Sequence, residues 1–404
     1  MIQKQTEKAS STEYVMLVAF VISIGALATD LMLPALDVIG QELRVNNPND
    51  VHFIVTAFFL GMAGGQLIVG PISDAFGRKP TILVGYFVFI LGCALSMFSQ
   101  DWTVMILGRI LQGLGAAAPR IVVVAMVRDE YEGRGMARIL SLVMTVFITV
   151  PIVAPALGEG FIYVGGWKAT FAGLILLSFL VSLWFYCRQP ETLLQSSRRP
   201  LRIRTLVTGL KEVVTTRVAM GYTIALGCIN GVFFGYLGSA QQIFQLTLKV
   251  GDLFVVYFAI ASVSLGAASL LNAKLVLKLG MRNLTWCALV ILTFLSACFF
   301  GILTLYQGIP LLSHFLVWQL STFFCVGIIF GNVSSLSLES MGHMAGLASA
   351  FVGSISTFIA LPMAWLIGYH YDGTLYPLVT GFTVIGLLAC VVVFWTEHDS
   401  SSTD

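Results

Sequence analysis

The chain alternates along its whole length between apolar runs of about 20 residues and short polar stretches. A helix of roughly 20 apolar residues spans the ~30 Å hydrocarbon core of a bilayer. We therefore predict twelve membrane-spanning helices, six on each side of a long polar break. The predicted spans are 14–36, 51–70, 80–99, 102–126, 137–163, 167–187, 217–238, 252–273, 283–305, 310–335, 345–367 and 375–396.

The composition supports a membrane protein. Of the 404 residues, 57% are hydrophobic and only 10% are charged, whereas a soluble domain carries roughly 25% charged residues to wet its surface. The first apolar run is longer than a signal-peptide core and lacks a small-x-small cleavage site, so we interpret it as a retained span. The seven cysteines lie in or beside apolar runs without metal or redox spacing, and we predict no cofactor and no metal site.

The polar break at 188–216 separates a first half, 1–187, from a second half, 217–404. We interpret this basic stretch as a cytosolic linker rather than a nucleic-acid patch. Lys and Arg concentrate on the cytosolic side of membrane proteins. With both termini in the cytosol, seventeen of the 22 basic residues lie in cytosolic segments and three in outside loops. We therefore predict cytosolic termini. The basic residues of the break are Arg188, Arg198, Arg199, Arg202, Arg204 and Lys211, with Arg217 at its edge.

The loop after the second span reads GPISDAFGRKP over residues 70–80. Together with two six-span halves and a basic linker, it resembles the major facilitator superfamily, whose signature here is G-x-x-x-D-R-x-G-R-K. Gly70, Asp74, Gly77 and Arg78 match, and Ala75 replaces the usual arginine. The resemblance implies an all-α major facilitator fold, and a role of these four residues in conformational gating. The alternative is a loop that only anchors the chain at the inner leaflet.

Two further spans extend the resemblance. The fourth contains R-x-x-Q-G-x-G, beginning at Arg109, and ends in VRDEY. With ATDLMLPAL in the first span, this is similar to the Bcr/CflA branch of drug:proton antiporters. The branch implies a monomer in the bacterial inner membrane. The fifth span carries VPIVAPALGEG, which resembles the antiporters' fifth-helix motif. Its Pro151 and Pro155 each remove a backbone hydrogen bond and make the helix bendable. Glu159 is either a gating residue or an interfacial one.

Asp30 is a carboxylate near the end of the first apolar run. A charge inside the membrane costs about 3 kcal/mol on insertion scales and commonly marks a pathway or a pair. Asp30 lies about six residues, roughly 9 Å, from the outer end of its span, and Arg109 lies about 10 Å from the outer end of the fourth. We therefore hypothesise that Asp30 faces Arg109 and that the two couple transport to protons, since motion that separates them changes the proton affinity of Asp30. A static structural ion pair is the alternative.

The candidate substrate cavity combines polar and aromatic side chains, as pockets for partly apolar ligands do. In the first half, Arg120 is on the same helical face as Arg109, eleven residues further in. Each candidate could instead serve only in packing. The candidates are Gln112, Arg120, Asn230, Phe234, Tyr236, Gln241, Tyr257 and Trp318.

The leading interpretation is a proton-coupled antiporter that exports small molecules, drug-like compounds or metabolites, by alternating access. Its predicted partners are a small-molecule substrate, protons and the lipid bilayer, but not nucleic acid. An alternative is a dedicated exporter of one endogenous metabolite, such as a siderophore or an amino-acid derivative. A channel is less favoured by the paired halves. A membrane enzyme is disfavoured because the loops are short and no HExxH, GxSxG or P-loop motif occurs.

Overall fold

The computed structural model describes residues 11–131, 133–198, 200–201 and 203–398. Lys4 and Lys8 of the tail and Arg199 and Arg202 of the basic break lie outside these residues. Within them the chain is helical and contains no strand. The principal helices are α1 (Ser11–Asp30), α2 (Leu36–Glu42), α3 (Phe53–Phe76), α4 (Arg78–Met97), α5 (Trp102–Glu130), α6 (Gly133–Arg188), α7 (Ile203–Thr215), α8 (Arg217–Gln241), α9 (Phe254–Leu279), α10 (Met281–Leu305), α11 (Leu312–Leu338), α12 (Ala345–Tyr369) and α13 (Tyr376–His398).

Ten helical stretches of the described chain are long and apolar enough to cross a membrane. Two of them, Arg138–Arg188 with 51 residues and Leu312–Tyr369 with 58, each cover two predicted spans. A straight helix of that length would measure more than ~75 Å, over twice a bilayer core. The first is broken at Gly165 and Gly166, whose backbone is not helical, and the second at η6 (Glu339–Met344). The predicted all-helical fold with two halves is confirmed.

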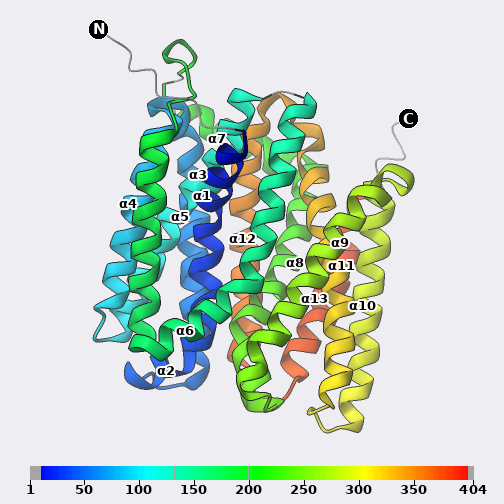
Figure 1. The fold of residues 1–404 in the computed structure, drawn as a ribbon. Coiled ribbons are helices and arrows are strands. Elements are labelled where there is room, and N and C mark those ends of the chain that lie inside the picture. The colour runs from blue at the N-terminus through cyan, green and yellow to red at the C-terminus, as the bar shows by residue number, and fades with distance from the viewer. Residues whose placement is uncertain (1–10, 132, 199, 202, 399–404) are drawn as a thin grey trace. The chain divides into compact units, whose positions relative to one another are not determined.

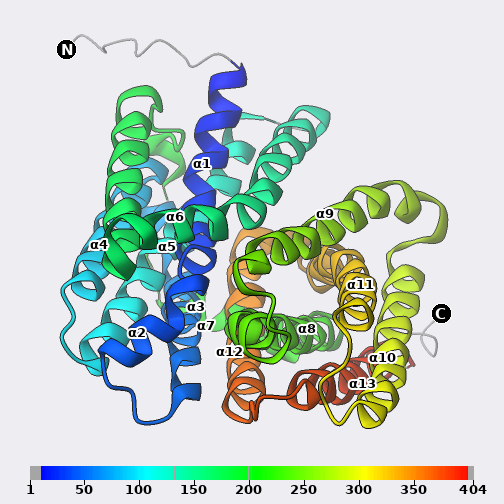
Figure 2. The ribbon, with the colours of Figure 1, turned by 60° about the horizontal axis from the view of Figure 1, so that its bottom comes forward.

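Two compact units make up the chain. The first contains the described residues up to Ile39 together with Ala57–Leu206, and the second contains Gly40–Thr56 together with the described residues from Val207 onward. In the first unit, α1 packs on α6 and α4 packs on α5 (Figure 1). In the second, α8 packs on α11, α12 and α13, and α10 packs on α11 and α13 (Figure 2).

The segment 40–56 differs from the predicted simple division, because it follows the first span in sequence but packs within the second unit. The side-chain amide of Asn49 donates to the carbonyl oxygens of Tyr369, at 2.9 Å, and Tyr371, at 2.7 Å. The ring of His52 is 3% exposed and lies so close to Gly238 and Gly368 that a Cβ at Gly368 would stand 2.7 Å from it. These contacts fasten the short helix η2 (Pro48–His52) to α8 and α12.

The basic break also contains structure. Helix α7 occupies Ile203–Thr215, with Val213 buried and Lys211 exposed. A Cβ at Gly209 would stand 2.6 Å from the side chain of Leu347. The predicted linker is therefore a packed amphipathic helix over much of its length.

Candidate functional site

Helix α1 ends at Asp30, and the chain continues through a turn into η1 (Leu33–Ala35) and α2. Pro34 has no N–H and cannot donate to the Asp30 carbonyl as another helical turn would require. The predicted span 14–36 lies within a stretch, Thr12–Glu42, that is long and apolar enough to cross a membrane, but its helix is interrupted after Asp30. The Asp30 side chain is 5% exposed, and its Oδ1 accepts a hydrogen bond from the Thr29 hydroxyl at 3.2 Å. The break thus places a buried carboxylate beside irregular backbone.

Arg109 stabilises this break from α5. Its side chain is completely buried. Nη1 donates to the Ala28 carbonyl at 3.1 Å and to the Gln112 side-chain oxygen. In a regular helix the Met32 amide would bond that carbonyl, but here it donates to Thr29 O at 3.3 Å. Arg109 therefore satisfies a backbone acceptor that the break releases.

The hypothesis placed Asp30 opposite Arg109. Arg109 does reach α1 two residues before Asp30, through Ala28. In this structure Arg109 contacts the backbone of α1 at Ala28, whereas the Asp30 carboxylate accepts from the Thr29 hydroxyl. The guanidinium also lies over the Phe58 ring, 4.9 Å from its centroid. A carboxylate inside the unit is thus close to a fixed cation without being neutralised by it.

The other residues of the α5 motif hold the helix against its neighbours. Gln112 is fully buried and donates from Nε2 to the Cys93 sulfur on α4 at 2.9 Å. At Gly113 a Cβ would collide with the Phe58 carbonyl on α3, and at Gly115 it would collide with α4. The motif therefore combines polar anchoring with the close backbone approach that small residues permit.

Arg120 lies on the same helix in a different environment. Its side chain is exposed, and its Nη1 lies 3.9 Å from the Met62 sulfur on α3.

Helix α6 passes close to the broken end of α1. A Cβ at Gly158 would collide with the Leu31 carbonyl oxygen and stand 3.2 Å from its carbonyl carbon. Pro155, three residues earlier, is buried, and Pro151 and Glu159 are half-buried. The two prolines lie inside the helix, where each removes a backbone hydrogen bond. The bendable part of α6 therefore packs directly beside the residue that follows Asp30.

The loop 70–80 forms a charged cluster. Gly77 has φ 113° and ψ 160°, a conformation that favours glycine, and it lets α4 begin directly after α3. Arg78, 4% exposed, pairs with Asp74 at 2.5 Å and with Asp129 of α5 at 2.9 Å. Gly70 lies one turn before Asp74 in α3. The guanidinium thus joins the ends of α3, α4 and α5.

Sequence reasoning missed Glu191, which completes this cluster. Its carboxylate accepts from the Arg78 amide at 2.9 Å and from the Lys79 amide at 3.2 Å. A carboxylate at a helix N-terminus is favoured by the helix dipole and by the free N–H groups there. Its position in the basic break, 113 residues after Arg78, gave no signal of this contact.

In the second unit, most candidate cavity residues are packed against other side chains. Tyr236 accepts from Gln319 Nε2 at 2.7 Å, and Trp318 stacks on Phe299 with ring centroids 5.1 Å apart. Their assignment to a substrate cavity stays a prediction. The remaining candidates are Asn230, half-buried; Phe234, buried; Gln241, which donates to Gln245 at 3.0 Å; and Tyr257, stacked on Phe244 at 6.0 Å.

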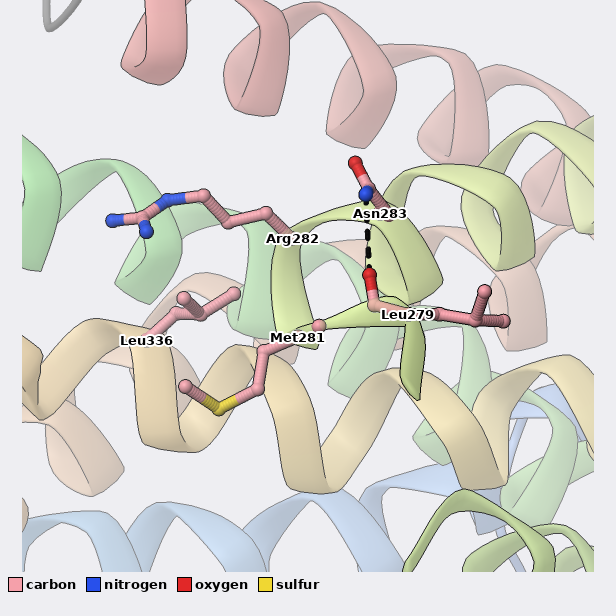
Figure 3. A pocket seen from close by; sticks show the side chains of 6 residues that line it. Leu279, Met281, Arg282, Asn283 and Leu336 are labelled. Carbon is pink, nitrogen blue, oxygen red and sulfur yellow. Dashed lines mark hydrogen bonds between the residues drawn. The ribbon is translucent and has the colours of Figure 1, made fainter. Parts of the chain in front are cut away.

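The second unit contains its own charged cluster, which was also not predicted. Arg282 pairs with Glu339 at 2.6 Å and with Glu397 at 3.1 Å. It lines a small pocket of about 250 Å³ at the start of α10. Figure 3 shows it pointing away from Asn283, whose amide donates to Leu279 O at 3.1 Å. Gly280, two residues before Arg282, has φ 76°, so α10 begins after a left-handed glycine as α4 does.

Helical halves, a broken span with a buried carboxylate, and charged clusters at helix ends are features of secondary transporters. The family model of the Major Facilitator Superfamily matches residues 16–364. The chain belongs to this superfamily and is a multi-pass membrane transporter.

Relatives agree with this membership. The chain is 29% identical over 384 residues to the bicyclomycin resistance protein homolog of Haemophilus influenzae, covering 93% of this chain and 94% of that protein. It is 23% identical over 408 residues to multidrug resistance protein D of Escherichia coli, covering 96% of each. The fold is similar to the crystal structure of a D-xylose-proton symporter, with a TM-score of 0.75, 14% identity, and coverage of 95% of this chain and 98% of that one. These matches support the predicted resemblance to the Bcr/CflA branch.

Proposed function

We propose that this transporter exports small molecules from the cytoplasm in exchange for protons, by alternating access. The names of two relatives refer to bicyclomycin resistance and to multidrug resistance, which supports efflux of drug-like compounds. It works in the bacterial inner membrane as a monomer with both termini in the cytoplasm. The distribution of Lys and Arg supports that orientation.

The observation that carries proton coupling is the Asp30 carboxylate. It is buried at a helix break inside a candidate span. It accepts a hydrogen bond from the Thr29 hydroxyl and is not directly paired with Arg109 in this structure. A carboxyl group in such a place gains or loses a proton when its surroundings change. The broken end of α1 gives the surroundings a way to change, because its backbone is held by Arg109 and by the packing of Gly158 rather than by a regular helix.

Three parts would then act together. Arg109 fixes the Ala28 carbonyl and with it the position of Asp30. The prolines of α6 let that helix bend beside Leu31. The ion pairs of Arg78 with Asp74 and Asp129 hold helix ends in one arrangement and exchange partners in another. Each ligand or proton shifts the equilibrium by its different affinity for the two arrangements.

Proton release on ligand addition tests the proposal. Purified protein in weak buffer should release protons when a transported drug is added, and Asp30→Asn should release none, since its amide cannot titrate. Asp30→Glu keeps a titratable group and should retain part of the release. Asp37→Asn, the same substitution on the following helix, is the matched control and should behave as wild type. Equal release from wild type and Asp30→Asn would remove Asp30 from the mechanism.

A further inference from the structure

Arg120 is a cation inside a span that finds no oxygen acceptor among the residues that the structure describes. Among the described residues, its Nη1 approaches the Met62 sulfur at 3.9 Å. Arg109, on the same helix, is held by a carbonyl, an amide and an aromatic ring. An arginine inside a membrane is costly and is commonly paired. The two arginines therefore differ in environment. Protein groups bind the guanidinium of Arg109, whereas those described above provide no acceptor oxygen for Arg120.

The surroundings of Arg120 follow from its position on α5. It lies one turn after Ala116, whose Cβ is 3.8 Å from the position that a Cβ on Gly25 of α1 would take. Its own contact is with α3. The side chain is exposed nonetheless, as are Val124 and Arg128, one and two turns further along α5. An exposed strip thus leads from Arg120 to the Glu130 end of the helix.

Gln66 adds an independent polar group at the same level. It is 2% exposed, and its side-chain oxygen has no hydrogen-bond partner in the described structure. It lies one turn after Met62 on α3, and the neighbouring Gly65 is so close to α5 that a Cβ there would be 2.6 Å from the Ala117 Cβ. Gln66 and Arg120 therefore leave their helices within about one turn of each other. A buried amide oxygen without a donor is costly.

Asp30 and Asp129, two acids of the first unit, lie away from Arg120. Asp30 is near the level of Arg109, and Arg120 is eleven residues, about 16 Å, further along α5. Asp129 is held by Arg78. A ligand that carries a carboxylate beside an N–H or O–H group would meet both needs at once, because the guanidinium binds the carboxylate in a planar fork and the Gln66 oxygen accepts from the neighbouring donor.

We propose that Arg120 and Gln66 form an anion subsite that binds the carboxylate of a small organic substrate. This assignment rests on the transport function proposed above and specifies its substrate class: organic acids and zwitterions rather than purely cationic drugs. The exposed strip gives such a substrate a path to the subsite from the Glu130 end of α5.

The test compares two fluorescent probes that differ only in charge, dansyl-glycine with its carboxylate and dansyl-glycinamide with a neutral amide. Binding is measured on the purified full-length protein in detergent, without a gradient. Wild type should bind dansyl-glycine at least about tenfold more tightly, as expected for one charge-assisted hydrogen bond. Arg120→Gln should abolish the preference and Arg120→Lys should keep part of it. Gln66→Leu should weaken the binding of both probes, because each carries the same sulfonamide N–H for the Gln66 oxygen.

Arg138→Gln is the matched control, because Arg138 is an exposed arginine of the same unit; it should keep the full preference. Because Arg120→Lys should keep part of the preference, it distinguishes lost recognition in Arg120→Gln from a folding defect. Equal binding of the two probes by wild type, no binding of either, or a preference that survives in Arg120→Gln would overturn the proposal. Displacement of dansyl-glycine by inorganic phosphate as readily as by unlabelled N-acetylglycine would also overturn it, by assigning the site to an inorganic counter-ion. If the preference for dansyl-glycine persists but ligand addition releases no protons, the proposed proton antiport is wrong and the anion subsite stands.

Discussion

Replacing Arg109 tests whether the broken end of α1 depends on a guanidinium or only on a positive charge. Arg109→Ala leaves the Ala28 carbonyl without its donor, because the Met32 amide is bonded to Thr29. A buried acceptor left unsatisfied costs about 1–3 kcal/mol. Loss of the cation from the Phe58 ring adds roughly 1–2 kcal/mol where the pair is desolvated. The free energy of unfolding should therefore fall by about 2–5 kcal/mol, as the sum of these two contributions.

Arg109→Lys keeps the charge but loses the planar guanidinium that lies over the Phe58 ring while its Nη1 donates to the Ala28 carbonyl and to Gln112. We expect less than half of wild-type transport from the lysine variant, and none from Arg109→Ala. Drug uptake into inside-out vesicles driven by a proton gradient measures transport, and thermal unfolding in detergent measures stability. Arg138→Ala, at an exposed arginine, is the control for loss of a charge.

Two results would refute this reasoning. Full transport by Arg109→Lys would show that charge alone suffices and that the geometry around Ala28 is unimportant. Wild-type stability of Arg109→Ala would show that the carbonyl finds another donor and that α1 does not depend on α5 at its break.

Three further predictions concern packing and helix ends. Glu191→Gln removes the charge that accepts from the first amides of α4 and should lower stability by about 0.5–1 kcal/mol in thermal unfolding. Gly113→Ala should lower the melting temperature clearly, because its methyl group forces α5 away from α3, whereas Gly64→Ala, with open space around it, should not. Asn49→Ala should speed amide hydrogen exchange across Pro48–His52 by releasing the segment from α12, and Asn46→Ala, at an exposed residue, should leave it unchanged. Unchanged exchange in the first variant would mean that packing alone fastens the segment.

The sequence was sufficient for the spans, the two halves and the residues of the loop 70–80, because these depend on local hydrophobicity and short motifs. It also placed Asp30 near the level of Arg109, since depth follows from counting residues along a helix of known rise. It did not reveal how the two are connected. Pro34 was a visible signal for the break, but the bond from Arg109 to Ala28 depends on which carbonyl the break releases.

Other residues were missed because their partners are distant in sequence. Gln66 lies in an ordinary apolar run, and its position next to α5 follows from the close approach of Gly65 to that helix. Glu191 follows the sixth span as one acid among basic residues, yet it binds the start of α4. Asn49 follows the first span but is bonded within the second unit. Hydrophobic periodicity carries no information about such pairings, which are set by the packing of whole helices.

The two charged clusters, around Arg78 and Arg282, share several features although they lie in different units. Arg78 follows Gly77, and Arg282 comes two residues after Gly280; both glycines have positive φ. Each arginine lies in the first turn of a helix and pairs with two carboxylates, Asp74 and Asp129 in one unit and Glu339 and Glu397 in the other. The amino-acid sequences around the two arginines differ, so only the first cluster matches the superfamily signature. What recurs is a left-handed glycine, a cation at the next helix start, and acids at neighbouring helix ends. Under the alternating access proposed above, such contacts at the helix ends of each unit would hold one arrangement, and a ligand or proton would shift the equilibrium by its different affinity for the two arrangements.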